Sequence, residues 1–167
     1  MDKNSFIIAI YVDNKSGVLT RVSSLFTRRG YNIDTLSVGE AEDPNFSRIT
    51  VSMRGTSEER IQLISQLKKL YNVKKVEVIS AEQGIRRELL LVKVRNTPET
   101  RADLRDTVDV FKAKIIDYSA DAMCLEITGD TSKVNAFLDN MKPFGIIEIC
   151  RTGIVAIERG PESLINK

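Results

Sequence analysis

The chain opens with a hydrophobic period that changes from strand to helix and back to strand. Residues 6–12, FIIAIYV, form a short run of apolar and β-branched residues, which predicts a strand. After a polar turn, apolar residues recur at helical spacing as far as Gly30, a candidate C-terminal cap; they are Val18, Leu19, Val22, Leu25 and Phe26. The period then shortens to that of a strand at Ile33, Leu36 and Val38.

Two more strands and a second helix complete the first half of the chain. The turn at residues 42–45 leads into the alternating run FSRITVSM, residues 46–53, so these two neighbouring strands are predicted to form an antiparallel hairpin. Thr56 or Ser57 can cap the next helix, whose predicted apolar face is Ile61, Ile64, Leu67 and Leu70. Residues 73–79, VKKVEVI, then predict a closing strand.

The second half repeats this order of elements with different residues. Strands are predicted at residues 87–95, 115–118, 123–128, 146–150 and 153–157. A helix follows Pro98 and Glu99, with an apolar face of Leu104, Val108 and Phe111. Thr131 or Ser132 can cap another helix, with an apolar face of Val134, Phe137 and Leu138.

Both halves therefore show the order strand, helix, strand, strand, helix, strand, which is typical of a ferredoxin-like sandwich. We predict an α+β protein of two tandem ferredoxin-like βαββαβ domains, residues 1–80 and residues 81–167, joined near residues 80–85. The repeat is one of pattern and not of sequence. A length of 167 residues suits two small domains of this kind.

Composition argues against several classes of function. Lys and Arg number 25 against 23 Asp and Glu, and a net charge of +2 argues against a dedicated nucleic-acid binder. Histidine is absent, which removes the Ser-His-Asp and Cys-His nucleophiles, the histidine general base and most zinc sites. Cys124 and Cys150 lie in apolar, strand-like segments without a CxxC motif, so we expect buried free thiols. No carboxylate pair reads as a catalytic acid and base.

Membrane insertion and export are not expected from this sequence. No apolar run approaches the roughly 20 residues that a membrane span needs. The start MDKNSFIIAIYVDNK has too short an apolar core for a signal peptide. We therefore expect a cytoplasmic protein.

The polar turn Asn14-Lys15-Ser16-Gly17 is the first candidate site. The N-terminus of a helix leaves backbone N–H groups without intrahelical partners and carries partial positive charge, so it favours a carboxylate or phosphate. Gly17 lacks a Cβ where a ligand could approach these amides. In the alternative interpretation, Asn14 or Ser16 caps the helix and Gly17 only permits a tight turn. A nucleotide site is disfavoured, because neither GxGxxG nor GxxxxGKS/T occurs.

Asn32 is the second candidate, at the start of the strand that follows this helix. A carboxamide can accept a hydrogen bond from an ammonium group and donate one to a carboxylate, which suits a zwitterionic amino acid. In a Gly-Tyr-Asn turn, asparagine is otherwise an ordinary turn residue. The residues alone leave both interpretations open.

The remaining charge clusters favour solvated surfaces. Three basic pairs have acidic neighbours and no aromatic platform, which favours a solvated face or a partner rim over phosphate contacts. They are Arg28-Arg29, Lys74-Lys75 and Arg86-Arg87. Asp103, Asp106 and Asp109 recur every third residue on a polar helix face with arginines nearby, which favours a solvated face over metal ligands. No metal site is predicted.

Three segments of the sequence stand out together: SGVLTRVSSLFTRRGYNIDTLSVG (16–39), DPNFSRITV (43–51) and RRELLLVKV (86–94). They resemble the regulatory small subunit of acetolactate synthase, also called acetohydroxyacid synthase. The resemblance covers essentially the full length and is most specific in residues 7–53, where the RRGYNI junction and the acidic-Pro hairpin occur in the family's order. The closing segment RTGIVAIERG resembles the family's end more loosely.

The resemblance implies that the first domain is an ACT domain, a ferredoxin-like module that senses amino acids. In that family two ACT domains pair side by side and hold a branched-chain amino acid at their interface. One protomer is then expected to supply Asn14, Gly17, Val18 and Leu19, and its partner Asn32 and Ile33. Backbone amides of residues 17–19 would hold the effector carboxylate, asparagine side chains its polar head, and the apolar residues its aliphatic side chain.

The resemblance further implies a non-catalytic regulatory subunit that forms a homodimer and activates a large catalytic subunit. It would confer feedback inhibition by valine, leucine or isoleucine. No cofactor is expected on this chain, because thiamine diphosphate, Mg and FAD belong to the catalytic partner; neither nucleic acid nor membrane is expected as a partner. Two other classes stay open. One is a free-standing amino-acid-binding ACT module that regulates transcription or another enzyme, and the other is a small metabolic enzyme, which the missing catalytic groups disfavour.

Overall fold

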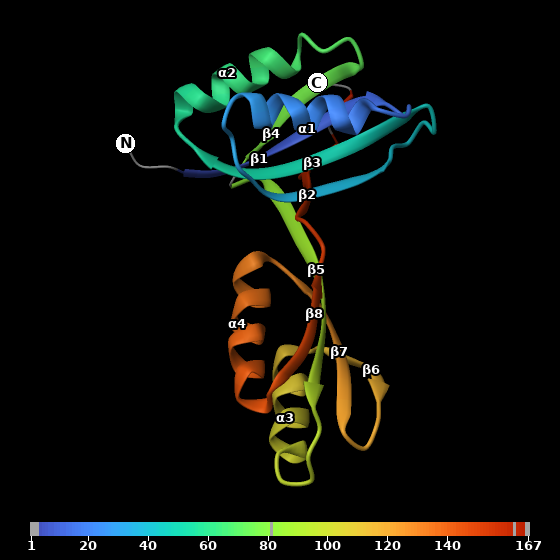
Figure 1. Cartoon of the computed structure of the whole chain (residues 1–167), viewed down its shortest axis with the longest axis vertical. Coiled ribbons are helices and arrows are strands. Elements are labelled where there is room, and N and C mark those ends of the chain that lie inside the picture. The colour runs from blue at the N-terminus through green and yellow to red at the C-terminus, as the bar shows by residue number, and fades with distance from the viewer. Residues whose placement is uncertain (1–3, 81, 162, 166–167) are drawn as a thin grey trace. The chain divides into compact units, whose positions relative to one another are not determined.

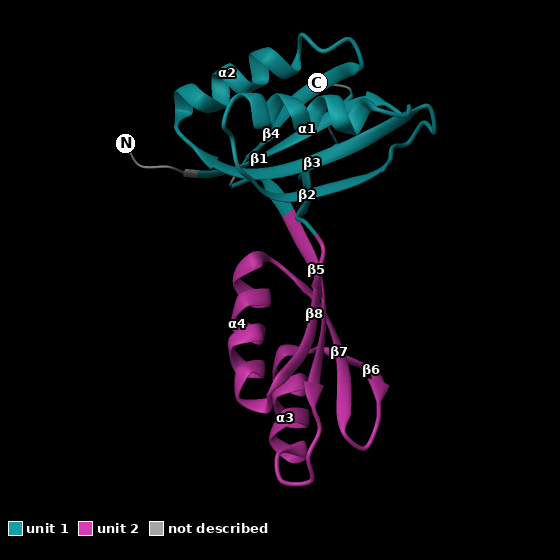
Figure 2. Cartoon of the chain, viewed as in Figure 1, with its two compact units in different colours: residues 1–85, 153–167 teal, residues 86–152 magenta. Residues whose placement is uncertain are grey.

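A computed structural model of the protein describes residues 4–80, 82–161 and 163–165 (Figure 1). The chain divides into two compact units (Figure 2). Unit 1 contains residues 1–85 and 153–167, and unit 2 contains residues 86–152. Unit 2 is therefore inserted into the sequence of unit 1. Among the described residues, no helix is long and apolar enough to cross a membrane.

Unit 1 is built on a four-stranded antiparallel sheet with two helices. Its main elements are β1 (Asn4–Asp13), α1 (Val18–Arg28), β2 (Ile33–Glu40), β3 (Phe46–Gly55), α2 (Ser57–Leu67) and β4 (Val73–Ile79). The strand order β2-β3-β1-β4 leaves β2 and β4 at the edges. This is the βαββαβ arrangement of a ferredoxin-like fold, as predicted from the sequence.

Helix α1 forms where apolar residues recur at helical spacing, and it buries Val18, Val22, Leu25 and Phe26. It ends in a Schellman motif, in which a residue with positive φ lets the last carbonyls find donors. Gly30 has a φ of 69°, its amide donates to the carbonyl of Thr27 at 3.1 Å, and the amide of Tyr31 donates to the carbonyl of Phe26 at 3.0 Å. The predicted terminating role of Gly30 is confirmed, and this turn leads the chain into β2.

Helix α2 begins with a capping box. The Thr56 hydroxyl accepts from the Glu59 amide at 3.2 Å, and the Glu59 carboxylate accepts from the Thr56 amide at 2.8 Å. The predicted cap at Thr56 is confirmed. The predicted apolar face is wrong in one position, because Leu63 and Leu67 are buried whereas Ile61 is 63% exposed. Residues two apart on a helix point in different directions, so Ile61 cannot share a face with Leu63.

Both faces of the unit 1 sheet are covered. The helices cover one face, where Ile8 and Ile10 of β1 join the core. Residues 153–161 and 163–165, called the strap below, return to the opposite face. Their Ala156 and Leu164 form a second apolar cluster with Ile7, Ala9 and Tyr11 of β1. β1 is therefore buried on both sides, which explains its nearly continuous apolar sequence.

Unit 2 repeats the topology of unit 1. Its elements are β5 (Gly84–Arg95), which begins in unit 1, α3 (Arg101–Phe111), β6 (Lys114–Tyr118), β7 (Ala122–Gly129), α4 (Thr131–Met141), the 3₁₀ helix η1 (Lys142–Phe144) and β8 (Ile146–Arg151). The strand order is β6-β7-β5-β8, and the strap contributes β9 (Val155–Glu158), which pairs with β5. Both predicted ferredoxin-like repeats are therefore present.

The core of unit 2 lies on one face of its sheet. Both helices and the inward-facing residues of β5 contribute to it, including Leu90, Val92, Leu104, Val108, Val134 and Phe137. On the other face of β5, Leu91 and Lys93 are only half-buried. Cys124 is also half-buried, and Cys150 is exposed because it lies on β8, an edge strand. The expectation that both cysteines are buried is therefore wrong.

Two further expectations differ from the structure. Residues 153–167 belong with unit 1, whereas the sequence placed them in a domain of residues 81–167; their apolar side chains pack on β1. The predicted cap of α4 at Thr131 or Ser132 is also wrong. Asp130 caps this helix by accepting from the Lys133 amide at 2.8 Å, and Thr131 instead donates its hydroxyl to Glu88.

Candidate functional site

The loop between β1 and α1 is braced by a polar network at its base. Asp13, the last residue of β1, accepts from the Asn72 side chain at 2.9 Å and pairs with Lys74 at 3.1 Å. The hydrogen bond from Asn72, followed by that from Lys74, holds the pKa of the Asp13 carboxyl below its ordinary value. Arg21 of α1 donates to Asn72 at 3.0 Å. The network therefore connects the start of α1 to the end of β1 and the start of β4.

Asn14 is held against the hairpin between β2 and β3. Its backbone amide donates to the carbonyl of Asn45 at 2.7 Å, and its side-chain Nδ2 donates to the carbonyl of Pro44 at 2.9 Å. The N-cap of α1 is Gly17, and no side chain caps the helix. The alternative in which Asn14 or Ser16 caps α1 is therefore wrong.

Gly17 adopts a left-handed conformation, with φ of 82° and ψ of −8°. A Cβ added there would meet nothing within 4 Å, so the backbone conformation requires the glycine and the space in front of it is open. The amide of Val18 makes a long 3.3 Å hydrogen bond to the Lys15 carbonyl. The amide of Leu19 lies in the first turn, where no intrahelical acceptor exists. The start of α1 thus presents positive partial charge to an open surface.

The two apolar candidates at the start of α1 have different environments. The Val18 side chain is 5% exposed and belongs to the core, so only its backbone faces the loop. The Leu19 side chain is 41% exposed. Among these two residues, only Leu19 offers an apolar surface to a ligand.

Asn32 and Ile33 lie at the other end of α1. Asn32 is exposed and donates its Nδ2 to the Asp34 carboxylate at 3.2 Å, while Ile33 packs half-buried against the helix-side core. The helix between Gly17 and this pair has 11 residues, which corresponds to about 16 Å at 1.5 Å per residue. One chain therefore does not bring the two predicted groups of site residues together.

The edge strand β2 carries apolar side chains toward the helix-covered side of the sheet. Leu36 and Val38 are opposite Val51 and Ile49, which belong to the helix-side core. Their side chains are nevertheless 37% and 47% exposed, because β2 has a hydrogen-bonded neighbour on one side only. An exposed apolar edge strand is a template for pairing with another chain.

A cavity that the sequence did not predict lies between the strap and the unit 1 sheet. Its volume is about 230 Å³, and Arg48, Glu42 and Glu77 are among the residues that line it. Arg48 donates to the carbonyl of Ala156 at 2.7 Å, and its burial lowers the pKa of its guanidinium. No motif marks these residues in the sequence. Among the described residues, no group of three or more His, Cys, Asp or Glu side chains could hold a metal ion.

The ferredoxin-like fold of unit 1 is that of a known class of small domains, the ACT domains. Residues 8–75 match a family described as the AHAS small subunit-like ACT domain, so unit 1 contains an ACT domain. Residues 87–160 match a second family, described as the small subunit of acetolactate synthase. The chain belongs to the family of acetolactate synthase small subunits, as the resemblance in the sequence implied.

Individual relatives agree with this assignment over nearly the whole chain. The probable acetolactate synthase small subunit of Archaeoglobus fulgidus is 45% identical over 153 residues, which cover 92% of this chain and 96% of that protein. The acetolactate synthase small subunit of Bacillus subtilis is 40% identical over 157 residues, which cover 93% and 91%. The crystal structure of the small subunit from Thermotoga maritima superposes with a TM-score of 0.89 at 38% identity, covering 95% of this chain and 99% of that one.

Proposed function

We propose that this chain is a non-catalytic regulatory subunit of acetolactate synthase. It binds the large catalytic subunit, raises its activity and makes it sensitive to feedback inhibition by a branched-chain amino acid. Membership of the small-subunit family supports a regulatory rather than a catalytic role. The large subunit would hold thiamine diphosphate, Mg and FAD, and it would carry out the formation of the carbon–carbon bond.

The effector would bind at the start of α1, and the open, uncapped Gly17 turn is the observation that carries this placement. Amides of the first turn would donate to the effector carboxylate. The hydrogen bond from its Nδ2 to the Pro44 carbonyl orders the Asn14 side chain, and its carbonyl oxygen would accept from a ligand's ammonium group. Leu19 would contact the aliphatic side chain, while Val18 would contribute only its backbone.

A homodimer would complete this site. Asn32 and Ile33 of the partner protomer would reach the first turn of α1, since those of the same chain lie at the far end of the helix. The exposed Leu36 and Val38 on edge strand β2 support pairing of two ACT domains along this strand. Burying these side chains between two protomers would stabilise the dimer and enclose the effector.

Inhibition requires that the effector binds the less active state of the complex more tightly than the active one, because equal affinity shifts no equilibrium. Couplings of this kind are typically about 1–3 kcal/mol, or roughly 5- to 150-fold in affinity. The regulatory subunit therefore needs only a modest difference between two states to control its partner.

Mixing the purified chain with the large subunit tests the function itself. We expect pyruvate condensation to accelerate and to become sensitive to valine, leucine or isoleucine. If neither change occurs, the regulatory-subunit proposal fails, and a free-standing ACT module becomes the better interpretation. Turnover by this chain alone would favour an enzyme.

The variant Gly17→Asp tests the effector placement. Asp tolerates the left-handed region better than most residues, and the open space accommodates its side chain, so the fold should persist. Its carboxylate would occupy the position of the effector carboxylate, so we expect loss of inhibition in a valine titration of the reconstituted complex, with activation kept. Gly17→Asn adds a side chain of similar size without the negative charge, so it separates the effect of charge from that of size. Gly160→Asp is a matched control, because Gly160 has a φ of 94° and equally open surroundings. Retained inhibition in Gly17→Asp counts directly against this placement.

A further inference from the structure

The strap contacts β2 where the chain leaves unit 2. A Cβ built on Gly153 would lie 2.7 Å from the carbonyl oxygen of Leu36 and 2.7 Å from the hydroxyl of Ser37. Contacts below 3.0 Å to a backbone atom force the backbone to move. Gly153 is therefore a glycine because its backbone lies directly against β2, and it has no room for any side chain.

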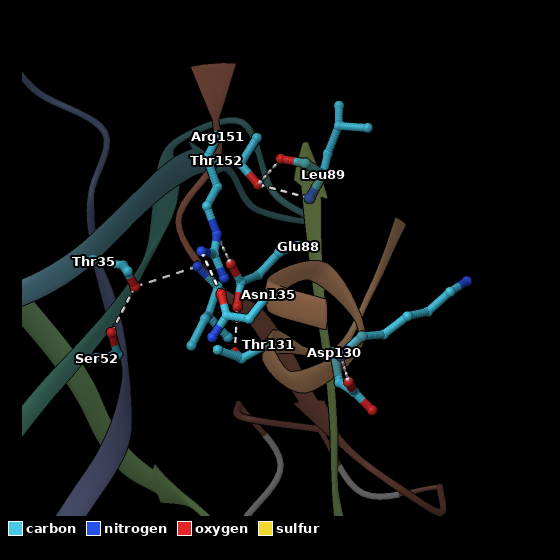
Figure 3. A network of polar contacts seen from close by, with 11 residues as sticks. Thr35, Ser52, Glu88, Leu89, Asp130, Thr131, Asn135, Arg151 and Thr152 are labelled. Atoms are coloured by element: carbon cyan, nitrogen blue, oxygen red, sulfur yellow. Dashed lines mark hydrogen bonds and ion pairs between the residues drawn. The ribbon is translucent and has the colours of Figure 1, made fainter. Parts of the chain in front are cut away.

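A hydrogen bond fixes the next residue of the strap to the same strand. The amide of Ile154 donates to the hydroxyl of Thr35 at 3.3 Å. This hydroxyl also shares a 2.6 Å hydrogen bond with Ser52 of β3 (Figure 3). Ser52 is buried. The Thr35 hydroxyl thus links the strap, β2 and β3 within unit 1.

The residues just before Gly153 are held in unit 2 by hydrogen bonds and an ion pair. Thr152 and Leu89 share two hydrogen bonds, each at 3.0 Å. The Thr152 amide donates to the Leu89 carbonyl, and the Leu89 amide donates to the Thr152 hydroxyl. Arg151 pairs with Glu88 and donates to Asn135 of α4 at 2.9 Å (Figure 3). Glu88 is only 3% exposed, so its partner Arg151 is costly to displace.

Adjacent residues are therefore anchored to different units. Thr152 is bound to β5, while Gly153 and Ile154 are bound to β2, and consecutive Cα atoms are held about 3.8 Å apart. Thr152 and Gly153 are joined by a single peptide bond, so a displacement of β2 against Gly153 acts on the residue that is hydrogen-bonded to β5. We call residues 151–154 the connector.

The start of β2 is suited to respond to a ligand. Its pairing with β3 changes register between Ile33 and Thr35, an irregularity of the kind that bends a strand and redirects its side chains. Asn32 and Ile33, the proposed effector contacts of this strand, lie on one side of that irregularity. Thr35, which holds the strap, lies on the other.

We propose that the connector transmits effector binding at β2 to unit 2, and that the Gly153 and Thr35 contacts are required for feedback inhibition but not for activation. This inference rests on the proposed function. It assigns to these two residues a positioning role, because neither touches the proposed effector site.

Two variants test the connector in the reconstituted complex. Gly153→Ala forces β2 and the strap apart, and Thr35→Val removes the hydroxyl while keeping the side-chain shape. Gly39→Ala is the matched control on the same strand, since its added Cβ meets nothing within 4 Å. Thr107→Val removes a hydroxyl that bonds only locally, to the Asp103 carbonyl of α3. Each chain is assayed for valine binding by calorimetry without the large subunit, then for activation and inhibition with it.

We expect Gly153→Ala and Thr35→Val to bind valine and to activate the large subunit as the unaltered chain does. With either variant, inhibition of the large subunit by saturating valine should fall by about 5-fold or more. This factor is the lower end of ordinary allosteric coupling. Because coupling is reciprocal, the large subunit should also stop changing their affinity for valine. Both controls should behave as the unaltered chain.

Undiminished inhibition in both variants would overturn the inference, as would loss of activation in parallel with inhibition. If a thermal melt shows that Gly153→Ala is unfolded at the assay temperature, activation and inhibition measured with Thr35→Val alone decide whether the inference holds. Absence of any valine inhibition with the unaltered chain would overturn the proposed function, and this inference with it. If valine inhibits the complex made with the unaltered chain and inhibits the complexes made with both variants equally, only the connector inference is overturned.

Discussion

Strands β1 and β5 occupy the same position in two sheets of the same topology, yet their surroundings differ. β1 is buried on both faces, with Ile8 under the helices and Ile7 under the strap. β5 buries Val92 under its helices but leaves Leu91 half-buried on the other face. Topology alone therefore does not determine how many layers a domain has. A short segment from a distant part of the chain turns one of the two sandwiches into a three-layered unit.

The two units consequently depend on different interactions. Unit 1 gains apolar burial from the strap, which is worth roughly 25 cal/mol for each Å² removed from water. On the open face of unit 2, Lys93 and Glu148 pair across neighbouring strands at 3.0 Å. An exposed pair of this kind typically contributes less than about 1 kcal/mol. Substitutions on the second face should therefore damage unit 1 much more than unit 2.

The largest difference is expected from a buried charge. Ile7→Asp would place a carboxylate in the apolar cluster between strap and β1, where its cross-strand neighbours are Ser52 and Ile79, at a cost of about 3–5 kcal/mol for an unpaired buried charge. Cys124→Asp puts the same group on the half-exposed face of unit 2, opposite Lys93, and should cost far less. Urea unfolding followed by circular dichroism measures both. Equal losses would contradict the distinction between the two faces.

A smaller contrast is expected from removing apolar volume. Ile7→Ala leaves a cavity under the strap and should cost about 2–4 kcal/mol, in the range for a fully buried aliphatic residue. Leu91→Ala, on the half-buried face of β5, should cost about half as much because water and neighbouring side chains fill the space. The same unfolding measurement applies. A loss at Leu91 as large as that at Ile7 would show that the second face of unit 2 is covered too.

Helix caps should contribute similar stability to both units, so the difference between the units should be confined to the second faces of their sheets. Thr56→Ala removes the capping box of α2 and should cost about 1 kcal/mol. Asp130→Ala removes the cap of α4 and should destabilise unit 2 in the same direction. Ser57→Ala, next to Thr56 but exposed, serves as the control. Thermal melts of the three variants test this expectation, and a Thr56→Ala melt that overlays the control would refute it.

The smallest effect concerns pH. The pKa of Asp13 in unit 1 is lowered first by its hydrogen bond from Asn72, and that of Asp130 in unit 2 first by the Lys133 amide. A lowered carboxyl pKa adds stability above the ordinary value of 3.8, and that stability is lost as pH falls through the folded-state pKa. Asp13→Asn and Asp130→Asn should each weaken the decline of melting temperature below about pH 4. An unchanged decline in both variants would argue against these interactions.

Local rules predicted most elements of this fold. The strand at residues 73–79 has its predicted bounds, and its β-branched residues pair with the apolar strand β1. The cap of α2 was predicted at Thr56 or Ser57, and Thr56 provides it. Asn14 and Thr131, both among the predicted cap alternatives, do not cap their helices, because the N-caps are Gly17 and Asp130. Their side chains instead donate to partners far away in sequence, the Pro44 carbonyl and Glu88. Side-chain partners at long range are not encoded in a local pattern.

The candidate site was predictable only in part. The α1 turn was found from its glycine and polar neighbours, and helical spacing alone could have assigned Val18 to the core. That Asn32 lies a helix length away from Gly17 also follows from the sequence. What would complete the proposed site cannot follow from one chain, since the proposal requires a second copy. The strap was missed because alternation in residues 153–157 predicts a strand without saying which sheet it covers.

The insertion of unit 2 within unit 1 has a consequence for synthesis. The strap leaves the ribosome after residues 86–152, and at about 5–20 residues per second those 67 residues take roughly 3–13 s. During that interval Ile7, Ala9 and Tyr11 have no cover on the strap side. Unit 1 is translated first but completed last, so a nascent chain displays an apolar sheet face on which chaperones can act.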